Sequence, residues 1–313
     1  EKVSPNIVVG LAPITYCSAH SMLNKTSPSC QSLKTIVEGW GKAANYLAFR
    51  GYGFNLAEVS APYPLITRWG QDIPFLFANN VRIWMPETMA NFESALPGLH
   101  LGCRLSWYPT ANPGEIMDEF YHRFYGAAAD LMRAYWETID RAWTDSPEHA
   151  GCGFGHLRRF TPATMKVARE ALDKAAAKAK TDVEKKRVQM ANDSFTEFEL
   201  FMKMRTDLAE GRFANLEVDS ALWQTNWIGL TAKYQPQYAF SPYGNNYFGQ
   251  FFAPAYRDAA RLAREFIVQP PLKPWRYQVN KEKLGETVGW QKPDLDDTVW
   301  PTTDPAIDTW ADL

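Results

Sequence analysis

The chain has 313 residues, enough for two or three domains, and its 46% hydrophobic content is that of a folded globular protein. Its 33 basic and 35 acidic residues give a net charge of -2, so it lacks the broad basic field that nucleic-acid binding requires. No apolar run reaches the roughly 18 residues that span a bilayer, and the chain opens without signal-peptide features, so we expect a soluble protein with no membrane span.

The region 1–110 alternates between predicted strands and predicted helices. Short β-branched or aromatic runs predict strands at 6–11, 46–50 and 81–85. Apolar residues at helical spacing predict helices at 33–40, 73–79 and 96–107. This order predicts a parallel α/β sheet, and the aromatic-rich loops that follow the strands favour a (β/α) barrel. Three such units cannot close eight strands, so we expect an incomplete barrel whose open side is covered by other protein.

From Asn112 onward the sequence predicts mostly helices. Asn112-Pro113 and Thr161-Pro162 each place a capping side chain before a proline that suits the first helical turn. Helical patterns follow at 127–143, 163–180, 181–211, 215–233 and 255–267. The Gly/Tyr/Asn-rich stretch 234–252 reads as an exposed loop. Alternation at 275–279 indicates that an all-β module begins there.

These patterns predict three regions. Residues 1–110 are expected to form part of a barrel, residues 111–268 an α-helical domain, and residues 269–313 the start of an all-β module. Alternating apolar residues at 99–107 are expected to join the first two regions, because they are too apolar to face water. Trp40 and Trp107 fall on predicted helices and are expected to be buried.

The stretch 118–135, DEFYHRFYGAAADLMRAY, preceded by LSWYP at 105–109, resembles a family of large secreted bacterial proteins that was long known only as a domain of unknown function. Some members of that family are endo-β-N-acetylglucosaminidases that act on N-glycans. The resemblance covers roughly residues 1–145, and the phrase around Tyr125-Gly126 is its most specific part. It implies that 81–85 is the last strand of a (β/α)8 TIM-type barrel, so that residues 1–110 are the C-terminal part of that barrel. The tail from Trp275 is similar to the entry of galactose-binding-type β-sandwiches, which implies that residues 269–313 are the start of a β-sandwich.

The resemblance also implies that part of the machinery is absent from these residues. A whole member carries about half of its barrel, and the acid/base carboxylate, before the point that corresponds to Glu1. The catalytic residues therefore stay unassigned, and we expect the first half of the barrel, or another chain that replaces it, to be a partner of this region.

Glycoside cleavage needs carboxyl groups at the carboxyl-terminal ends of barrel strands. Glu87 directly follows a predicted strand, and Glu58 lies in the loop after the strand at 46–50. For Glu87 substrate binding is favoured over catalysis, and loop bracing stays open as the alternative; for Glu58 a solvated loop charge is favoured. Aromatic and imidazole side chains in the same loops suit sugar rings, although each could equally well be a packing residue. They are Tyr16, His20, Tyr52, Tyr63 and Trp69. Trp84, which lies inside a strand, is expected in the core.

No cofactor and no metal ion is expected. The five histidines are scattered, and the sequence contains neither a phosphate-cradling glycine loop nor a nucleophile elbow. The four cysteines at 17, 30, 103 and 152 fit one bridge, with Cys17 and Cys30 as its candidates, or four buried thiols.

Two functions remain open. The first is a secreted, periplasmic or cell-surface glycoside hydrolase, whole or in part, that acts on a complex and N-acetylated oligo- or polysaccharide. The second is a non-catalytic carbohydrate-binding or surface-assembly protein that retains the hydrolase fold, which fold alone cannot separate from the first.

Overall fold

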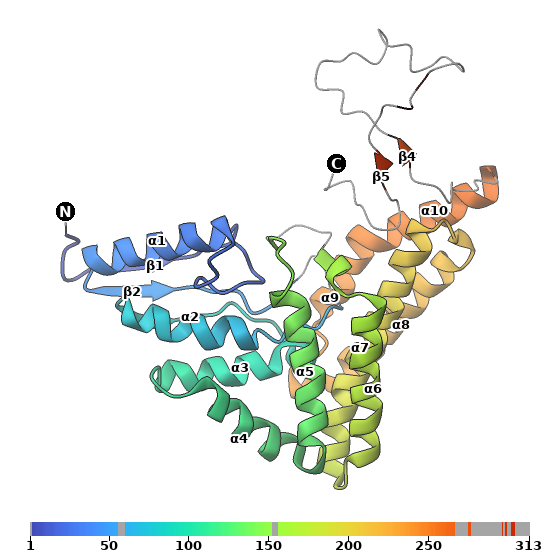
Figure 1. The fold of residues 1–313 in the computed structure, drawn as a ribbon. Helices are drawn as coiled ribbons and strands as arrows, with labels where there is room; N and C mark the ends of the chain where they lie inside the picture. Colours follow the sequence, from blue (N-terminus) through green and yellow to red (C-terminus); the bar gives the residue numbers. More distant parts are fainter. Residues whose placement is uncertain are drawn as a thin grey trace.

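The computed structural model describes residues 2–55, 60–151 and 156–266, and in the tail Trp275, Arg276, Asp296, Thr298, Thr302 and Thr303. Most of these residues are helical, and three short strands alternate with the first helices (Figure 1). The predicted alternation of strands and helices in the first part of the chain is confirmed, with three strands and their connecting helices.

The sheet has three parallel strands in the order β1-β2-β3. These strands are Val8–Leu11, Tyr46–Phe49 and Val81–Trp84. Helix α1 (Pro28–Ala43) connects β1 to β2, and helix α2 (Ile66–Ala78) connects β2 to β3. The register of β2 against β3 shifts after Leu47, so that Ala48 pairs with Ile83.

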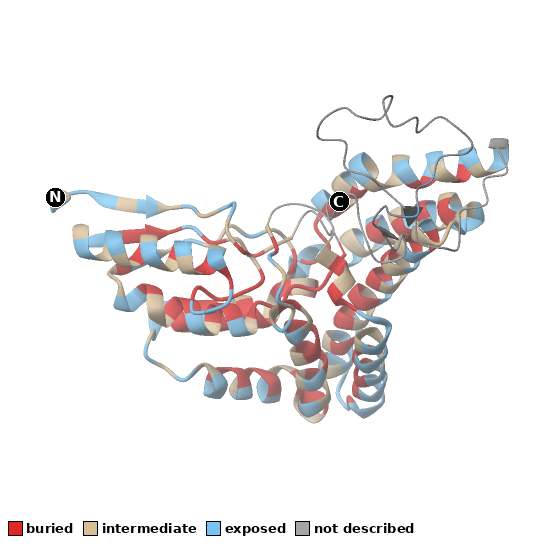
Figure 2. Cartoon of the chain, turned by 45° about the horizontal axis from the view of Figure 1, so that its top comes forward, coloured by how far each residue is buried: buried red, intermediate tan, exposed pale blue. Residues whose placement is uncertain are grey.

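Helices cover one face of the sheet. Leu47 and Val81 on that face pack with Leu33, Val37 and Leu76 in a small hydrophobic cluster. The opposite face, which we call the open face, carries apolar side chains that are 43–51% exposed. They are Val8, Tyr46, Ile83 and Met85. In Figure 2 the strand β1 has the colours of exposed and intermediate residues. A sheet in a globular fold normally buries both faces when its strands are parallel, so the open face is unusual.

Eight helices follow the sheet in the described part of the chain. They are α3 (Phe92–Trp107), α4 (Pro113–Tyr125), α5 (Ala129–Thr144), α6 (Pro162–Lys178), α7 (Asp182–Ala209), α8 (Leu216–Tyr234), α9 (Pro242–Tyr247) and α10 (Ala253–Phe266). The predicted caps are confirmed: the side chain of Asn112 accepts from the backbone of Gly114, and that of Thr161 accepts from Thr164.

One continuous hydrophobic core runs from the loop after β1 into the helices. It includes Trp69 of α2, Trp136 of α5, Phe198 of α7 and Trp223 of α8. In Figure 2 buried positions, in red, occur both on the helices beside the sheet and on those of the helical region. The sheet with its connecting helices and the helical region therefore pack together through a shared interior.

Two expectations about the helices are wrong. The stretch predicted as a loop at 234–252 contains α9 and a π-helical turn at Phe248–Phe252. Trp107 is 83% exposed and Trp40 is 37% exposed, although both were expected to be buried. On α3, Leu101 and Leu105 are fully buried and Cys103 is exposed. The reason is helical geometry, because residues four apart share a face whereas residues two apart point in different directions.

The predicted β-sandwich at 269–313 lies almost wholly outside the described residues. Within it the structure places a two-stranded antiparallel pair, β4 (Trp275–Arg276) with β5 (Thr302–Thr303). The sandwich therefore stays a prediction. Among the described residues, no helix combines the length and hydrophobicity that crossing a membrane would require.

Candidate functional site

The carboxyl-terminal ends of the three strands meet at one edge of the sheet. We call this edge, with the residues that directly follow the strands at 12–27, 50–55 and 85–91, the carboxyl edge. In parallel α/β folds ligands bind at this edge, because the loops there converge from several strands.

Glu87 lies at the carboxyl edge and forms an ion pair with Arg50. Its Oε2 is 2.5 Å from Nη2 of Arg50, and the two side chains are 39% and 53% exposed. Arg50 directly follows β2, and Glu87 follows β3, so the pair joins the ends of two neighbouring strands. A charged pair at this exposure remains available to a ligand from solvent.

The backbone around Glu87 is fixed by pairing that extends the sheet. The N–H of Glu87 donates to Gly51 O at 2.8 Å, and the N–H of Gly53 donates to Glu87 O at 2.9 Å. Tyr52 and Glu87 form a parallel β-bridge. The side chain of Asn91 donates to Gly53 O at 2.8 Å. Glu87 is thus held on a rigid segment, which is what a binding residue requires.

A cavity of about 20 Å³ lies where the carboxyl edge meets the helical region, and Asn55, Glu93 and Trp227 are among its lining residues. Such a volume suits a single water molecule. Glu93 is 4% exposed, and its carboxylate accepts a hydrogen bond from the backbone N–H of Phe240 at 2.8 Å. Burial raises the pKa of Glu93 to about 8. Glu93 is therefore mostly neutral at pH 7. Its buried side chain connects the start of α3 to Phe240 and does not face solvent as an acid.

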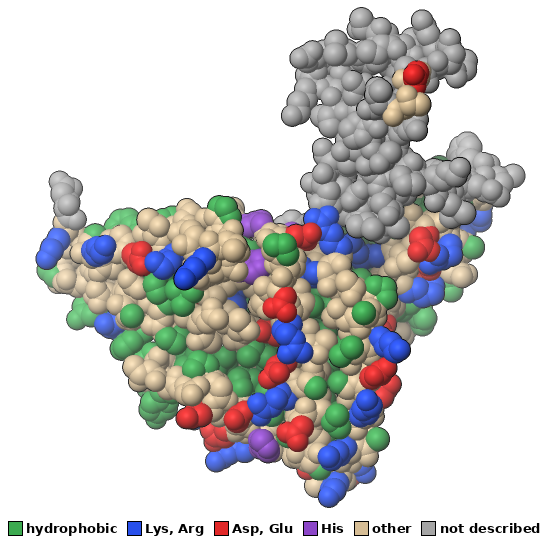
Figure 3. Space-filling view, viewed as in Figure 1, with side chains coloured by type: hydrophobic (Ala, Val, Ile, Leu, Met, Phe, Trp, Pro, Cys, Tyr) green, Lys and Arg blue, Asp and Glu red, His purple; other side chains and the backbone are tan. Residues whose placement is uncertain are grey.

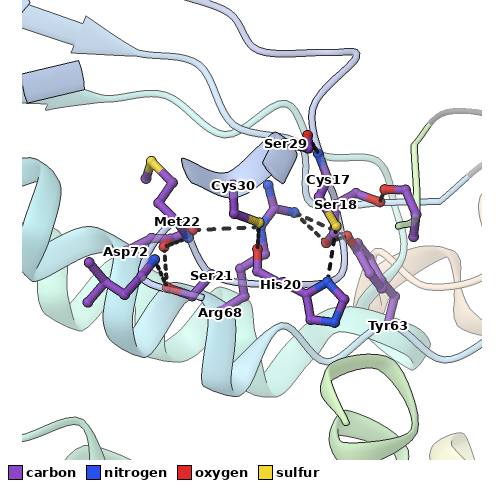
Figure 4. Close-up of polar contacts among 12 residues, drawn as sticks. Cys17, Ser18, His20, Ser21, Met22, Ser29, Cys30, Tyr63, Arg68 and Asp72 are labelled. Atoms are coloured by element: carbon purple, nitrogen blue, oxygen red, sulfur yellow. Dashed lines mark hydrogen bonds and ion pairs between the residues drawn. The ribbon is translucent and has the colours of Figure 1, made fainter. Parts of the chain in front are cut away.

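The segment after β1 carries a buried cluster of Cys17, His20 and Cys30, which we call the cysteine cluster (Figure 4). The sulfur of Cys17 lies 3.2 Å from Nδ1 of His20, and Nε2 of His20 lies 2.6 Å from the carbonyl oxygen of Ser146. A hydrogen bond with the Cys30 thiol, together with the His20 contact, lowers the pKa of Cys17. The hydrogen bond with Cys17 raises the pKa of His20.

Polar side chains from helix α2 hold the same segment in place. Asp72 accepts hydrogen bonds from Ser21 Oγ at 2.7 Å and from the backbone of Met22 at 2.8 Å. Arg68 donates to Ser18 O at 2.7 Å, and its Nε lies 3.7 Å from Asp72. Burial raises the pKa of Asp72 to about 6, against the opposing effect of Arg68. These bonds make the segment after β1 a fixed part of the fold.

The structure brings together only some of the predicted site residues. Glu87 and Tyr52 are neighbours at the carboxyl edge, and Tyr16 is half-buried against the cluster beneath the sheet. His20, Tyr63 and Trp69 are 2–3% exposed, so none of them presents a ring to a ligand in this conformation.

The buried members of that set have partners within the core. The hydroxyl of Tyr63 donates to Ser18 O, and the ring of Trp69 packs edge-on against Trp84 with centroids 4.9 Å apart. The expectation that Trp84 packs in the interior agrees with this contact. Glu58 lies outside the described residues.

Sequence reasoning missed the residues that tie the carboxyl edge to the rest of the chain. Asn91 and Glu93 stand at the start of α3, where an asparagine followed by an acidic residue is itself a helix-start signal. The partners of Glu93 and His20 are Phe240 and Ser146, which are too distant in sequence for any local pattern to reveal. Among the described residues, no three His, Cys, Asp or Glu side chains gather as a metal site would need.

A family comparison covers the sheet and the helices next to it. Residues 1–137 match the family described as Domain of unknown function (DUF4838). The matched stretch contains β1 to β3, α1 to α4 and about half of α5. No curated protein and no solved structure matches the chain.

Proposed function

We propose that the carboxyl edge binds carbohydrate and that Glu87 is the residue that accepts sugar hydroxyls there. One observation carries the proposal: an exposed carboxylate and guanidinium, Glu87 and Arg50, are paired across the ends of adjacent parallel strands. Carboxylates accept two hydroxyl hydrogen bonds, and a guanidinium offers a planar set of donors, which suits the alternating hydroxyls of a sugar ring. Tyr52 lies beside this pair and supplies a half-exposed aromatic edge.

The resemblance of residues 1–145 to secreted glycosidase-type proteins supports the choice of ligand class. It favours a complex, N-acetylated glycan as the ligand and a secreted or surface location for the protein. On this proposal the sheet is the C-terminal part of a (β/α)8-type barrel, and its open face is part of the barrel interior.

The surface beside β3 supports the idea that more polypeptide packs on this sheet. A cleft of about 540 Å³ runs along the free edge of β3, with Phe77, Ile83 and Trp107 among its lining residues. Figure 3 shows hydrophobic side chains gathered over α2, α3 and the loop between α3 and α4. Additional β/α units, from the same protein or from another chain, would cover Trp107 and the open face together.

Binding is favoured over catalysis for the described residues. Hydrolysis by the common mechanisms needs two carboxyl groups on opposite sides of the scissile bond. Among the described residues that directly follow the strands, at 12–27, 50–55 and 85–91, Glu87 is the one carboxylate. A hydrolase built on this chain would therefore take a further carboxyl group from elsewhere, and a non-catalytic binding protein would need none.

The test is glycan binding by the whole chain and its Glu87→Gln variant. Titration with N-acetylglucosamine oligomers, followed by calorimetry, should show affinity for the native chain and at least a tenfold loss for Glu87→Gln. The matched control is Glu38→Gln, because Glu38 is 36% exposed and paired with Lys34 on α1, away from the carboxyl edge. Equal binding by the two variants, or no binding by the native chain to any glycan tested, would refute the proposal.

A further inference from the structure

Cys17 lies in the segment 12–27 that connects β1 to α1, and Cys30 lies in the first turn of α1. Each is 2% exposed, and both belong to the main hydrophobic core. The backbone N–H of Cys17 donates to Oγ of Ser29 at 2.9 Å, so residue 17 lies directly beside the start of α1. We propose that Cys17 and Cys30 are a redox-active pair that closes into a disulfide across the base of this segment.

The arrangement of the sulfurs supports closure without rearrangement of the fold. Both side chains meet at His20: the Cys30 thiol donates to the carbonyl oxygen of His20, which lies 3.8 Å from the Cys30 sulfur, and the Cys17 sulfur lies 3.2 Å from Nδ1 of the same residue. Two cysteine side chains that meet at one residue come within bonding distance by side-chain rotation, provided that their Cβ atoms face each other. Asp72 and Arg68 hold the backbone of the segment in either redox state.

His20 is placed to take the proton from Cys17. A carbonyl oxygen only accepts hydrogen bonds, so Nε2 of His20, at 2.6 Å from Ser146 O, carries the hydrogen. The lone pair of Nδ1 then faces the Cys17 sulfur at 3.2 Å. Transfer of the thiol proton to Nδ1 leaves a thiolate beside an imidazolium, and the thiolate is the form of cysteine that attacks disulfides.

The oxidant is a low-molecular-weight disulfide such as oxidised glutathione. The Cys17 thiolate attacks one sulfur of that disulfide, whose S–S bond breaks, and the released thiolate takes a proton from the His20 imidazolium. The sulfur of Cys30 then attacks Cys17 and expels the second thiolate, which takes the proton that Cys30 loses. Two protein thiols lose two electrons and two hydrogens, and the oxidant becomes two thiols.

The burial of both sulfurs slows the reaction. Neither thiol is exposed in the folded state, so an external disulfide reaches Cys17 only when the segment 12–27, which carries Cys17 and His20 together, moves away from its neighbours, or before that segment has packed during folding. Oxidation should therefore be slow in the folded chain and fast during refolding. In contrast, Cys103 is exposed, so an external disulfide reaches it without any opening of the fold.

The primary test is peptide mapping of the reduced whole chain after refolding in oxidised glutathione. Trypsin cleaves after Lys25, so it separates the Cys17 peptide, 3–25, from the Cys30 peptide, 26–34. Mass spectrometry without reduction should find these two peptides joined, at a mass two hydrogens below their sum. Cys103→Ser should leave this product unchanged, and Cys17→Ser should abolish it. Peptide 3–25 joined to the Cys152 peptide, 142–158, or alkylation of both Cys17 and Cys30 after oxidation, would overturn the proposal.

A second measurement tests the role of His20 and does not depend on the cysteine variants. The rate of closure in His20→Gln should fall about tenfold at pH 6.5 and approach the native rate near pH 9, where a thiol ionises without help. Circular dichroism confirms that the variant is folded before its rate is compared. A rate that falls equally at both pH values would show that His20 only packs against Cys17, and would remove it from the mechanism.

Discussion

Asp140 of α5 accepts hydrogen bonds from both the backbone N–H and the hydroxyl of Thr67 at the start of α2, at 3.1 and 2.5 Å. The same carboxylate accepts from the backbone of Ile66 at 2.9 Å. Helix α2 starts after Leu65, which has a left-handed backbone and provides no side-chain cap. The cap of α2 therefore comes from another helix, 73 residues later in the sequence.

Replacing Asp140 with alanine should destabilise the whole chain by about 1 to 2 kcal/mol, because it removes the carboxylate that caps the N–H groups of Ile66 and Thr67 at the start of α2. Asp140→Asn should cost less, because the amide oxygen still accepts one of these bonds. Urea unfolding followed by circular dichroism measures both. The control is Asp173→Ala, whose exposed pair with Arg169 should contribute less than about 1 kcal/mol. Equal losses for Asp140→Ala and Asp173→Ala would contradict the capping role.

The buried carboxyl group of Glu93 should make the free energy of unfolding depend on pH. Burial raises its pKa to about 8 in the folded chain, above the ordinary value of 4.5, so the folded state holds the proton more tightly than the unfolded state does. The stabilising contribution is complete below pH 4.5 and is lost as the pH rises through 8. Glu93→Gln keeps an acceptor for the Phe240 N–H and carries no charge, so its stability should decline less than that of the native chain over this range.

Thermal unfolding at pH 5, 7 and 8.5 distinguishes the two proteins. The melting temperature of Glu93→Gln should exceed that of the native chain at pH 8.5, and the difference should shrink at pH 5. Glu115→Gln is the matched control, because Glu115 also stands in the first turn of a helix but is exposed. A difference that does not change with pH would show that the Glu93 carboxyl does not titrate as its burial implies.

Gly126 occupies a backbone conformation that other residues avoid. Its φ is 51° and its ψ is -117°, and a Cβ placed there would also meet the side chain of Glu184. Gly126→Ala should therefore lower stability by about 1 to 3 kcal/mol. Gly229→Ala is the control, because Gly229 lies in helix α8 with nothing within 4 Å of the new Cβ. That change should stabilise the chain by up to about 1 kcal/mol.

The tryptophans Trp107 and Trp143 differ in exposure, so their substitution should affect stability differently. Trp107 is 83% exposed, whereas Trp143 is 2% exposed and donates through its indole N–H to Pro62 O at 2.8 Å. Trp107→Ser should change the melting temperature of this chain by less than about 1 °C, and Trp143→Phe should lower it by several degrees. A large loss for Trp107→Ser would mean that the cleft beside β3 closes on Trp107 in solution.

Local signals in the sequence predicted much of the fold. The caps at Asn112 and Thr161 were visible because each needs only a few neighbouring residues. The parallel order of β1 to β3 followed from alternating strand and helix patterns. Helix α1, however, begins at Pro28 rather than near residue 33, although Ser27 before Pro28 is itself a cap signal.

The candidate site was harder to predict than the fold, for a physical reason. An aromatic residue in a loop packs or faces solvent according to what the rest of the chain places above it. Tyr63 lies under Trp143, which is far from it in the sequence, with ring centroids 5.0 Å apart. Composition could indicate that aromatic side chains gather near the strand ends, but not which of them are covered. The position of Glu87 just beyond β3 was predicted correctly, because it depends on local order alone.

The cap of α2 is supplied by Asp140 of α5, and this affects how the chain folds as it is synthesised. When the region that contains the sheet has left the ribosome but α5 has not, the N–H groups of Ile66 and Thr67 still lack the carboxylate of Asp140, and Glu93 lacks the N–H of Phe240. Helix α2 therefore gains its N-terminal cap only after residues far downstream in the sequence have been synthesised. Domains generally fold as units during synthesis. Here a nascent chain arrested before α4 should remain sensitive to protease, and one arrested after α10 has emerged should be resistant.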